Sequence, residues 1–311
     1  MSFKKFLFIL SKEAAGGRNL PTAEEIREYV NPNLDVEIVK TEYKNHTTEL
    51  AREFGQKNPG AVIVACGGDG TLREVAKGVY GTDSYFSFLP CGTGNDFNRS
   101  VSGEVDKIKL LKNIHNLEPD MLDLIEIGGD ICLNVWSFGF DADLLVEAKK
   151  IQKKYPKIME SSYLFAALKT VFGKISSKIE YEVETISGEI KKGKGDYILG
   201  NIANGKYYGG GFNPAPHAEV SDGILNLMLV DKMSVVELVS LISKYKKGKH
   251  TSLKKVHMFE VTRGKIRSLE GELIGNFDGD IIPFHEAEFR VLKHALKFAR
   301  FRENIYGQYK N

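Results

Sequence analysis

The sequence predicts two domains: an N-terminal three-layer α/β domain and a C-terminal antiparallel β-sandwich. The first part alternates short apolar runs with helical patterns, which is typical of a sheet covered by helices on both faces. The second part alternates apolar and polar residues with a period of two, which is typical of antiparallel strands. The length, 311 residues, also suits two domains of roughly 150 residues. We place them at 1–125 and 126–302, and expect 303–311 to be a tail that packs back on the N-terminal domain.

In the N-terminal part, apolar runs predict strands at Phe3–Leu10, Val36–Thr41, Ala61–Cys66, Tyr85–Leu89 and Met121–Ile127. The third run contains no charged residue, as is typical of a strand buried on both faces of a parallel sheet. Helical patterns lie between the strands, at Ala23–Val30, Thr47–Lys57, Thr71–Tyr80 and Val105–His115. Right-handed crossovers through these helices give the three layers.

In the C-terminal part, alternation predicts strands at Lys178–Ile186, Asp196–Ile202, Ile224–Val230, Val256–Thr262, Glu286–Leu292 and Ala295–Phe301. Two helical segments interrupt them. The first covers Ala142–Phe172 and is broken at Pro156. The second covers Ser234–Lys247, and its apolar face is predicted to hold Val235, Leu238, Val239 and Ile242.

Composition excludes several classes of protein. Lys plus Arg number 43 against 41 Asp plus Glu, so the chain lacks the basic excess of nucleic-acid-binding proteins. Three cysteines are too few for a disulfide framework and suit a reducing compartment. No apolar run reaches the roughly 20 residues that span a bilayer. We therefore expect a cytoplasmic protein. Peripheral contact at the inner face of the membrane is a further expectation. We also expect a monomer or homodimer.

The most informative segment is Gly67-Gly68-Asp69-Gly70-Thr71, which joins an apolar strand to a helical pattern. Glycines let the backbone approach a polyphosphate, and the helix start attracts its charge. Asp69 would repel phosphate unless a cation lay between them, so the segment indicates a nucleotide with magnesium. Thr71 is expected to cap the helix. The alternative is a tight turn without a ligand.

A second glycine-rich turn, Gly92-Thr93-Gly94-Asn95-Asp96, follows the next strand. Neighbouring parallel strands deliver their loops to the same edge of a sheet, where open α/β sheets bind ligands. We expect Gly94 to adopt a positive φ angle. Neither turn is a Walker A loop or a G-x-G-x-x-G fingerprint.

With these two turns the sequence resembles the diacylglycerol kinase and sphingosine kinase superfamily, especially its soluble bacterial lipid kinases. The resemblance rests on Gly67–Thr71 and Gly92–Phe97, and it extends over nearly the whole chain. Asn134–Ala142 resembles the segment that enters the second domain, and Asn204–Leu225 resembles the family's Gly-Gly-Gly and Asp-Gly-x-Leu region. Asp278-Gly279-Asp280 stands where the family usually has Asp-Gly-Glu.

The resemblance implies that ATP meets a lipid hydroxyl in a cleft between the domains. Asp69, Asp96 and Asp123 would form an acidic, water-filled network that positions catalytic Mg²⁺. Carboxylates gathered in a cleft need a cation, because like charges raise one another's pKa; a turn or surface role remains the alternative for Asp123. Thr41 matches a position near the nucleotide. The segment Ser11–Arg18 lacks the family's Asn-Pro.

Two further sites follow from the resemblance. Glu219, Asp222 and the carbonyl of Ile224 correspond to a structural magnesium site; a hairpin turn is the alternative. Asp280 would be the general base that accepts the proton of the lipid hydroxyl, although it is one methylene shorter than the usual glutamate. Its alternative role is to satisfy backbone groups of the turn.

The leading hypothesis is an ATP-dependent lipid kinase that phosphorylates diacylglycerol or a related lipid at the membrane surface. An NAD kinase-like or sugar kinase activity on a water-soluble acceptor is the enzymatic alternative. A non-catalytic lipid- or nucleotide-binding protein is the alternative of another class. Six lysines in Ser240–Lys255 could attract anionic lipid or form a solvated basic face.

Overall fold

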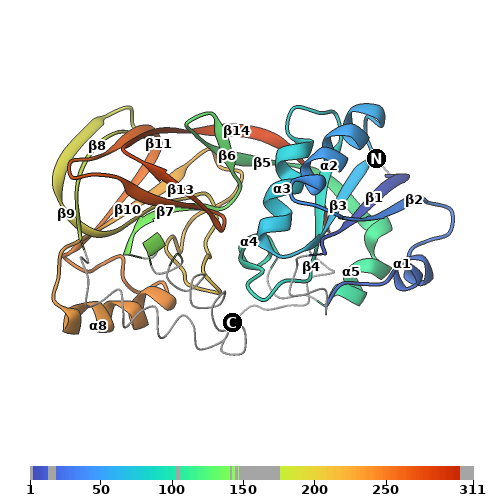
Figure 1. Cartoon of the computed structure of the whole chain (residues 1–311), viewed down its shortest axis with the longest axis horizontal. Coiled ribbons are helices and arrows are strands. Elements are labelled where there is room, and N and C mark those ends of the chain that lie inside the picture. Colours follow the sequence, from blue (N-terminus) through green and yellow to red (C-terminus); the bar gives the residue numbers. More distant parts are fainter. Residues whose placement is uncertain are drawn as a thin grey trace.

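The computed structural model describes residues 3–12, 19–102, 106–140, 142–143, 146 and 176–301 (Figure 1). In the N-terminal half the elements are β1 Lys5–Leu10, α1 Ala23–Tyr29, β2 Asp35–Lys40, α2 His46–Lys57, β3 Val62–Gly67, α3 Asp69–Val79, β4 Tyr85–Pro90, α4 Asp96–Val101, α5 Lys107–Lys112, a 3₁₀ turn Ile114–Asn116 and β5 Leu117–Ile127. In the C-terminal half they are β6 Asp130–Cys132, β7 Val135–Gly139, β8 Ser177–Thr185, β9 Ile190–Ala203, β10 Leu225–Asp231, α8 Val235–Lys246, β11 Val256–Ser268, β12 Leu273–Phe277, β13 Asp280–Phe284 and β14 Glu286–Phe301.

The N-terminal half is the predicted three-layer α/β domain. Its parallel strands run in the order β4-β3-β1-β2. One core packs α2 and α3 against the sheet, through residues such as Phe54 and Leu72. A second core packs α1 and α5 against the opposite face, through Ile26 and Leu110. β3 is buried along its whole length, which explains its uninterrupted apolar run.

The C-terminal half is a β-sandwich around a separate core, which contains Trp136, Phe138, Leu227 and Phe289. β9 and β10 alternate their side chains between this core and α8, because successive residues of a strand point to opposite faces. Ile198 and Met228 therefore pack against α8. Four short strands, β6, β7, β12 and β13, were not predicted from the sequence.

β14 is one strand that belongs to both domains. The sequence predicted two strands there, and the structure instead joins them through an irregularity between Leu292 and Leu296. The first half of β14 pairs with β11 in the sandwich. β5 pairs with both halves. The second half also meets β4 at Phe298, so that it extends the parallel sheet. Figure 1 shows β14 crossing between the domains along one edge of the molecule.

The apolar face of α8 differs from the predicted one. Leu238, Leu241 and Tyr245 pack on the sandwich, whereas Val239 and Ile242 are exposed. Most of the helix predicted over 142–172, part of the loop 11–18 and the tail 303–311 lie outside the described residues. Among the described helices, none is long and apolar enough to cross a membrane.

Candidate active site

The two glycine-rich loops meet at the carboxyl edge of the parallel sheet. β3 ends at Gly67 and β4 at Pro90, and these residues are neighbours in the parallel ladder. The backbones of Gly68 and Gly92 then touch, because a Cβ added to Gly92 would lie only 2.5 Å from Gly68 Cα. Glycine at both positions thus lets the two loops form one continuous surface. We call this surface, formed by Gly68 and Gly92 and their loops, the floor of the site.

The first loop leads directly into α3. The helix begins at Asp69 with Gly68 as its N-cap, so the prediction that Thr71 caps the helix is wrong. Thr71 is instead buried against Gly67, where a Cβ would lie 2.3 Å from its Oγ1. Because a glycine N-cap has no side chain to bind the first N–H groups, those groups stay available to an anion.

The second loop is closed by Asn95. This residue has a left-handed backbone, with φ of 50°. Its side-chain oxygen accepts from the Gly92 amide at 3.0 Å, and its side-chain amide donates to the Gly92 carbonyl at 2.9 Å. Gly94, in contrast, does not have the predicted positive φ. Its constraint is space, because a Cβ there would lie 2.9 Å from Asp69 Oδ2 and 3.4 Å from Asp96 Oδ2.

Asp69 is the acid at the centre of this floor. Its Oδ1 accepts from the Phe97 amide at 3.1 Å. Burial, followed by the negative charge of Asp96, raises the pKa of Asp69 to about 6, although the Phe97 and Asp96 amides oppose this increase. A carboxylate offers roughly four acceptor sites, so two backbone donors leave capacity for a cation. A divalent ion would also keep the carboxylate ionised.

Asp96 connects the two domains. Its two carboxylate oxygens accept from the amides of Gly210 and Gly211, each at 2.7 Å. Burial raises the pKa of Asp96, and the two glycine amides oppose that effect. Asp96 therefore holds the glycine turn with Gly210 and Gly211 against the start of α4. This turn borders the floor on the side of the sandwich.

Asp123 does not join Asp69 and Asp96. It is fully buried in β5, where its oxygens accept from the amides of Gly223 and of His294, the latter at 2.7 Å. Among the described residues, no group of three or more His, Cys, Asp or Glu side chains could hold a metal ion together. Backbone amides balance the charge of Asp123 within the fold, and its part in a water-filled network around Mg²⁺ stays a prediction.

Asp280 enters the site from the sandwich, at the start of β13. Its exposed carboxylate contacts the guanidinium of Arg73, which is almost completely buried on α3. The same guanidinium binds Asp130 at 3.0 Å, and Lys77 binds the other oxygen of Asp130 at 2.6 Å. This chain of charges fixes the position of the β12–β13 turn over the first turns of α3.

Asp278, in the same turn, organises the entry to the second domain. It has a left-handed backbone, with φ of 48°. Its carboxylate accepts from the amides of Leu133, Asn134 and Val135 at 2.7 to 3.2 Å. Its charge also contributes to the raised pKa of Asp69, so it lies near the floor. Sequence reasoning missed Asp278 and Arg73; an arginine between the buried Leu72 and Val75 was the available signal.

Thr41 and the basic residues beside the second loop complete the edge. Thr41 is buried at the end of β2, and its hydroxyl accepts from the Lys12 amide at 3.0 Å. A cavity of 270 Å³ lies next to Gly92. Arg99 and Lys107 line it, and Arg99 Nε donates to the Gly94 carbonyl at 3.2 Å. These two cations give the floor a positive side. Thr93 and Gly70 are exposed.

The predicted structural magnesium site lies elsewhere, in the loop before β10. Asp222 is exposed, and its Oδ1 accepts from the Ile224 amide at 2.9 Å. Burial raises the pKa of Asp222, and the charges of Asp123 and Glu219 raise it further. The amide contact is the one expected of the turn alternative, while the neighbouring acids are what the metal prediction requires.

The residues at the floor fit Mg²⁺ bound together with phosphates. Mg²⁺ is usually held by one or two carboxylates plus phosphate oxygens and waters rather than by an all-protein cage. Asp69 supplies such a carboxylate beside a backbone floor. A single available acid is therefore sufficient for a nucleotide-borne cation, even though the described residues form no larger cluster.

The fold and the site together define a class of two-domain proteins: a catalytic α/β domain with a glycine-rich floor, joined to a β-sandwich. Residues 5–127 match the family model of the diacylglycerol kinase catalytic domain. Residues 134–300 match that of the YegS C-terminal NAD kinase beta sandwich-like domain. The chain belongs to the diacylglycerol kinase-like family of lipid kinases that includes the YegS-like proteins.

Individual relatives agree with this assignment. A "probable lipid kinase YegS-like" of Pseudomonas savastanoi pv. phaseolicola is 30% identical over 76% of this chain and 74% of its own. Its counterpart in Pseudomonas syringae pv. tomato is 33% identical over 54% of this chain, which spans about half (53%) of that relative.

Solved structures share the fold. A diacylglycerol kinase from Bacillus anthracis str. Sterne superposes with a TM-score of 0.70 over 98% of both chains, at 17% identity. An NAD kinase from Archaeoglobus fulgidus in complex with ATP is more distant, with a TM-score of 0.51, 13% identity and coverage of 96% of this chain and 95% of that one. At these identities the likeness concerns the fold alone.

Proposed function

We propose that this protein transfers the γ-phosphate of ATP to the hydroxyl of diacylglycerol or a related lipid. The observation that carries the proposal is the joint floor of Gly68 and Gly92, with Asp69 beside it and the N-terminus of α3 open to an anion. Such a floor suits a polyphosphate with a cation. Membership of the lipid kinase family supports a lipid as the acceptor.

In this proposal the N-terminal domain binds the nucleotide. The first-turn amides of α3 and the amides of the second loop would face the phosphates, and Arg99 and Lys107 would attract their charge. Thr41 would lie at the far end of the same edge. Mg²⁺, when bound, would neutralise the charge that develops on the transferred phosphoryl group. Asp69 would hold that cation against the phosphates.

The sandwich would supply the base. The carboxylate of Asp280 is exposed, while the buried guanidinium of Arg73 holds it in one place. We propose that it accepts the proton of the lipid hydroxyl as that oxygen forms its bond to the γ-phosphorus. The bond from this phosphorus to the bridging oxygen breaks at the same time, and ADP leaves. The products are a phosphorylated lipid and ADP.

A radiolabelled ATP assay tests the proposal. The acceptors would be diacylglycerol, a sphingoid base, ceramide and phosphatidylglycerol in mixed micelles, with NAD and simple sugars as water-soluble competitors. We expect label in one or more lipids and none in the soluble acceptors. A soluble acceptor consumed faster than any lipid would establish the NAD kinase-like or sugar kinase alternative. ATP binding without transfer to any acceptor would indicate a binding protein.

A further inference from the structure

α8 exposes an apolar stripe that no other described part of the chain covers. Leu238, Leu241 and Tyr245 use one side of the helix to pack on the sandwich. On the remaining surface, Val236 is 81% exposed, Val239 64% and Ile242 40%. A helix on the surface of a soluble protein usually presents polar residues to solvent. Three exposed aliphatic side chains on one helix therefore indicate a surface that contacts another apolar surface, such as a membrane or a protein.

Lysines follow this stripe along the chain. Lys244 and Lys246 lie in the last turn of α8, and three more follow in the loop that leads to β11. We call the stripe and these lysines the α8 surface: Val236, Val239, Ile242, Lys244, Lys246, Lys247, Lys249 and Lys254. The five lysines are all exposed, and the salt bridges among the described residues include none of them. Glu237, the acid of this segment, is bound by Lys255 at 2.8 Å.

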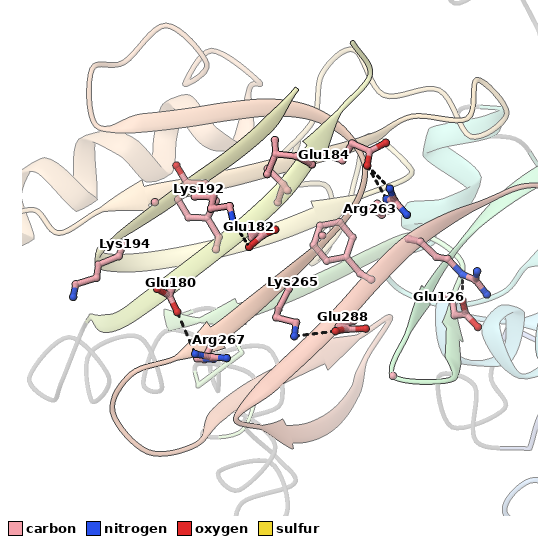
Figure 2. Close-up of a pocket in the computed structure, with 18 of the residues that line it drawn as sticks. Glu126, Glu180, Glu182, Glu184, Lys192, Lys194, Arg263, Lys265, Arg267 and Glu288 are labelled. Atoms are coloured by element: carbon pink, nitrogen blue, oxygen red, sulfur yellow. Dashed lines mark hydrogen bonds and ion pairs between the residues drawn. The ribbon is translucent and has the colours of Figure 1, made fainter. Parts of the chain in front are cut away.

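Another charged region of the sandwich is built differently. A depression of 1230 Å³ lies over the outer face of β8, β9, β11 and β14 (Figure 2). There acids and bases bind one another across the strands, in the pairs Glu184–Arg263, Glu180–Arg267, Glu182–Lys192, Glu288–Lys265 and Glu126–Arg290. That face is balanced and solvated. The α8 surface, in contrast, combines exposed apolar groups with lysines that no described acid pairs with.

The α8 surface is also linked to the candidate active site by a short path. The Tyr245 hydroxyl, on the inner side of α8, donates to the Tyr208 hydroxyl at 3.0 Å. Tyr208 pairs through its backbone with Phe212. Between them lie Gly210 and Gly211, whose amides bind Asp96. A single hairpin therefore connects the inner side of α8 to the acid that closes the phosphate floor.

We infer that the α8 surface docks this protein on an anionic lipid bilayer. Val236, Val239 and Ile242 would enter the boundary between headgroups and acyl chains, as the apolar side of an interfacial helix does. The lysines that follow them would meet anionic headgroups, and the charge complementarity favours a membrane over an uncharged partner. The inference rests on the proposed function, because a kinase acting on a bilayer lipid must bring its cleft to that bilayer.

Sedimentation with lipid vesicles tests this inference on the full-length protein. Vesicles of phosphatidylcholine with phosphatidylglycerol would be compared with vesicles of phosphatidylcholine alone, and we expect binding only to the former. Lys246→Gln with Lys247→Gln should lower the affinity by about five-fold for each lysine removed. Val236→Glu with Val239→Glu should lower it by about 100-fold or more, because apolar contact is lost and repulsion is added.

The matched control is Lys192→Gln with Lys194→Gln, which removes the same charge from the face shown in Figure 2. Its binding should stay within about two-fold of that of the wild type if local charge near the membrane is what counts. An equal loss of vesicle affinity in the control variant would overturn the inference. Wild-type protein that does not bind anionic vesicles would also overturn it. So would size-exclusion data in which the valine variants convert a dimer to a monomer without changing vesicle binding.

Turnover of a dissolved short-chain diacylglycerol separates this inference from the proposed function. We expect the valine variants to phosphorylate the dissolved lipid at the wild-type rate, and to lose activity only on lipid in vesicles. If the wild type phosphorylates neither form of diacylglycerol nor any other lipid of the acceptor panel but still binds anionic vesicles, the proposed function is wrong and the docking surface remains. If the variants lose both activities equally, the α8 surface acts through the fold and the docking inference is wrong.

Discussion

The glycine-rich floor and the paired strands β5 and β14 each contain a central aspartate. The two aspartates have opposite environments. At the floor, Asp69 accepts from amides of its own domain and is half-buried. At the crossing, Asp123 is fully buried and accepts from two segments of the other half, at Gly223 and His294. The degree of burial and the backbone donors, rather than residue type, thus distinguish a half-buried acid that could still bind a cation from a fully buried structural one.

The largest effect should come from Asp69→Asn. Turnover should fall by about 10⁴-fold or more, because the charge that holds the cation on the phosphates is lost. Steady-state kinetics measures this change, and Asp83→Asn, an exposed aspartate before β4, should leave turnover near that of the wild type. A folded Asp69→Asn variant with wild-type turnover would show that the site is assigned wrongly.

The same variant has an effect on stability that depends on pH. The pKa of Asp69 is about 6 in the folded chain, against an ordinary value of 3.8. A raised carboxyl pKa means that the folded state loses stability as pH rises from about 4 through 6, because ionisation is costly there. Without ligand, Asp69→Asn should therefore melt at a higher temperature than the wild type at pH 8, and the difference should disappear below about pH 4.

Asp280→Asn should be the next largest change. Loss of the proposed base should lower kcat by about 10² to 10⁴, with little change in ATP affinity. Asp280→Glu should keep substantial activity because it retains the carboxylate. Steady-state kinetics would measure kcat, and calorimetric titration with ATP would measure the affinity separately. Full turnover by the Asn variant, which can make the same turn hydrogen bonds, would assign Asp280 to the turn alone.

Asp123→Ala should show its main effect in stability. Removing the carboxylate leaves the amides of Gly223 and His294 buried without their acceptor, which should lower the free energy of unfolding by about 3 kcal/mol. Chemical denaturation measures this loss. Asp120→Ala, on the same strand but in a half-exposed ion pair with Arg300, should cost less than about 1 kcal/mol. Equal losses would mean that the comparison of Asp69 with Asp123 has no structural basis.

Gly94→Val should weaken ATP binding by about 10-fold, since any Cβ at this position meets the Asp69 carboxylate. Gly94→Ala carries the same Cβ without branching, so its effect should be smaller. Calorimetric titration with ATP gives both affinities. If valine leaves the affinity unchanged, the second loop does not contribute to the floor.

The smallest effect should come from the loop before β10. If magnesium is bound there, Asp222→Ala and Glu219→Ala should each lower the free energy of unfolding by about 1 kcal/mol or less. The melting temperature should fall accordingly, and excess Mg²⁺ should partly restore it. The turn alternative predicts a loss only for Asp222→Ala, because only its side chain binds the Ile224 amide. In that case Mg²⁺ has no effect on either variant.

Local patterns were sufficient to predict the layers and the meeting of the two glycine-rich loops, because parallel strands bring successive loops to one edge. They were not sufficient where distant segments decide the structure. Arg73 meets Asp280 across 207 positions of sequence, and Asp278 meets Asn134 across 144. β12 and β13 have five residues each, too few for a clear alternation. In β14, the irregularity beside His294 interrupted the pattern, so one strand was predicted as two.

The path of β14 also has a consequence for biosynthesis. The ribosome releases β1 to β4 first, yet the outer neighbour of β4 comes from the last strand of the described chain. Until Phe298 arrives, Phe86 and Phe88 lack the ring that covers them at 5.8 and 6.1 Å, and β4 remains an unpaired edge open to aggregation. The domain that is translated first is therefore completed last, because its sheet gains this neighbour only when β14 has been synthesised.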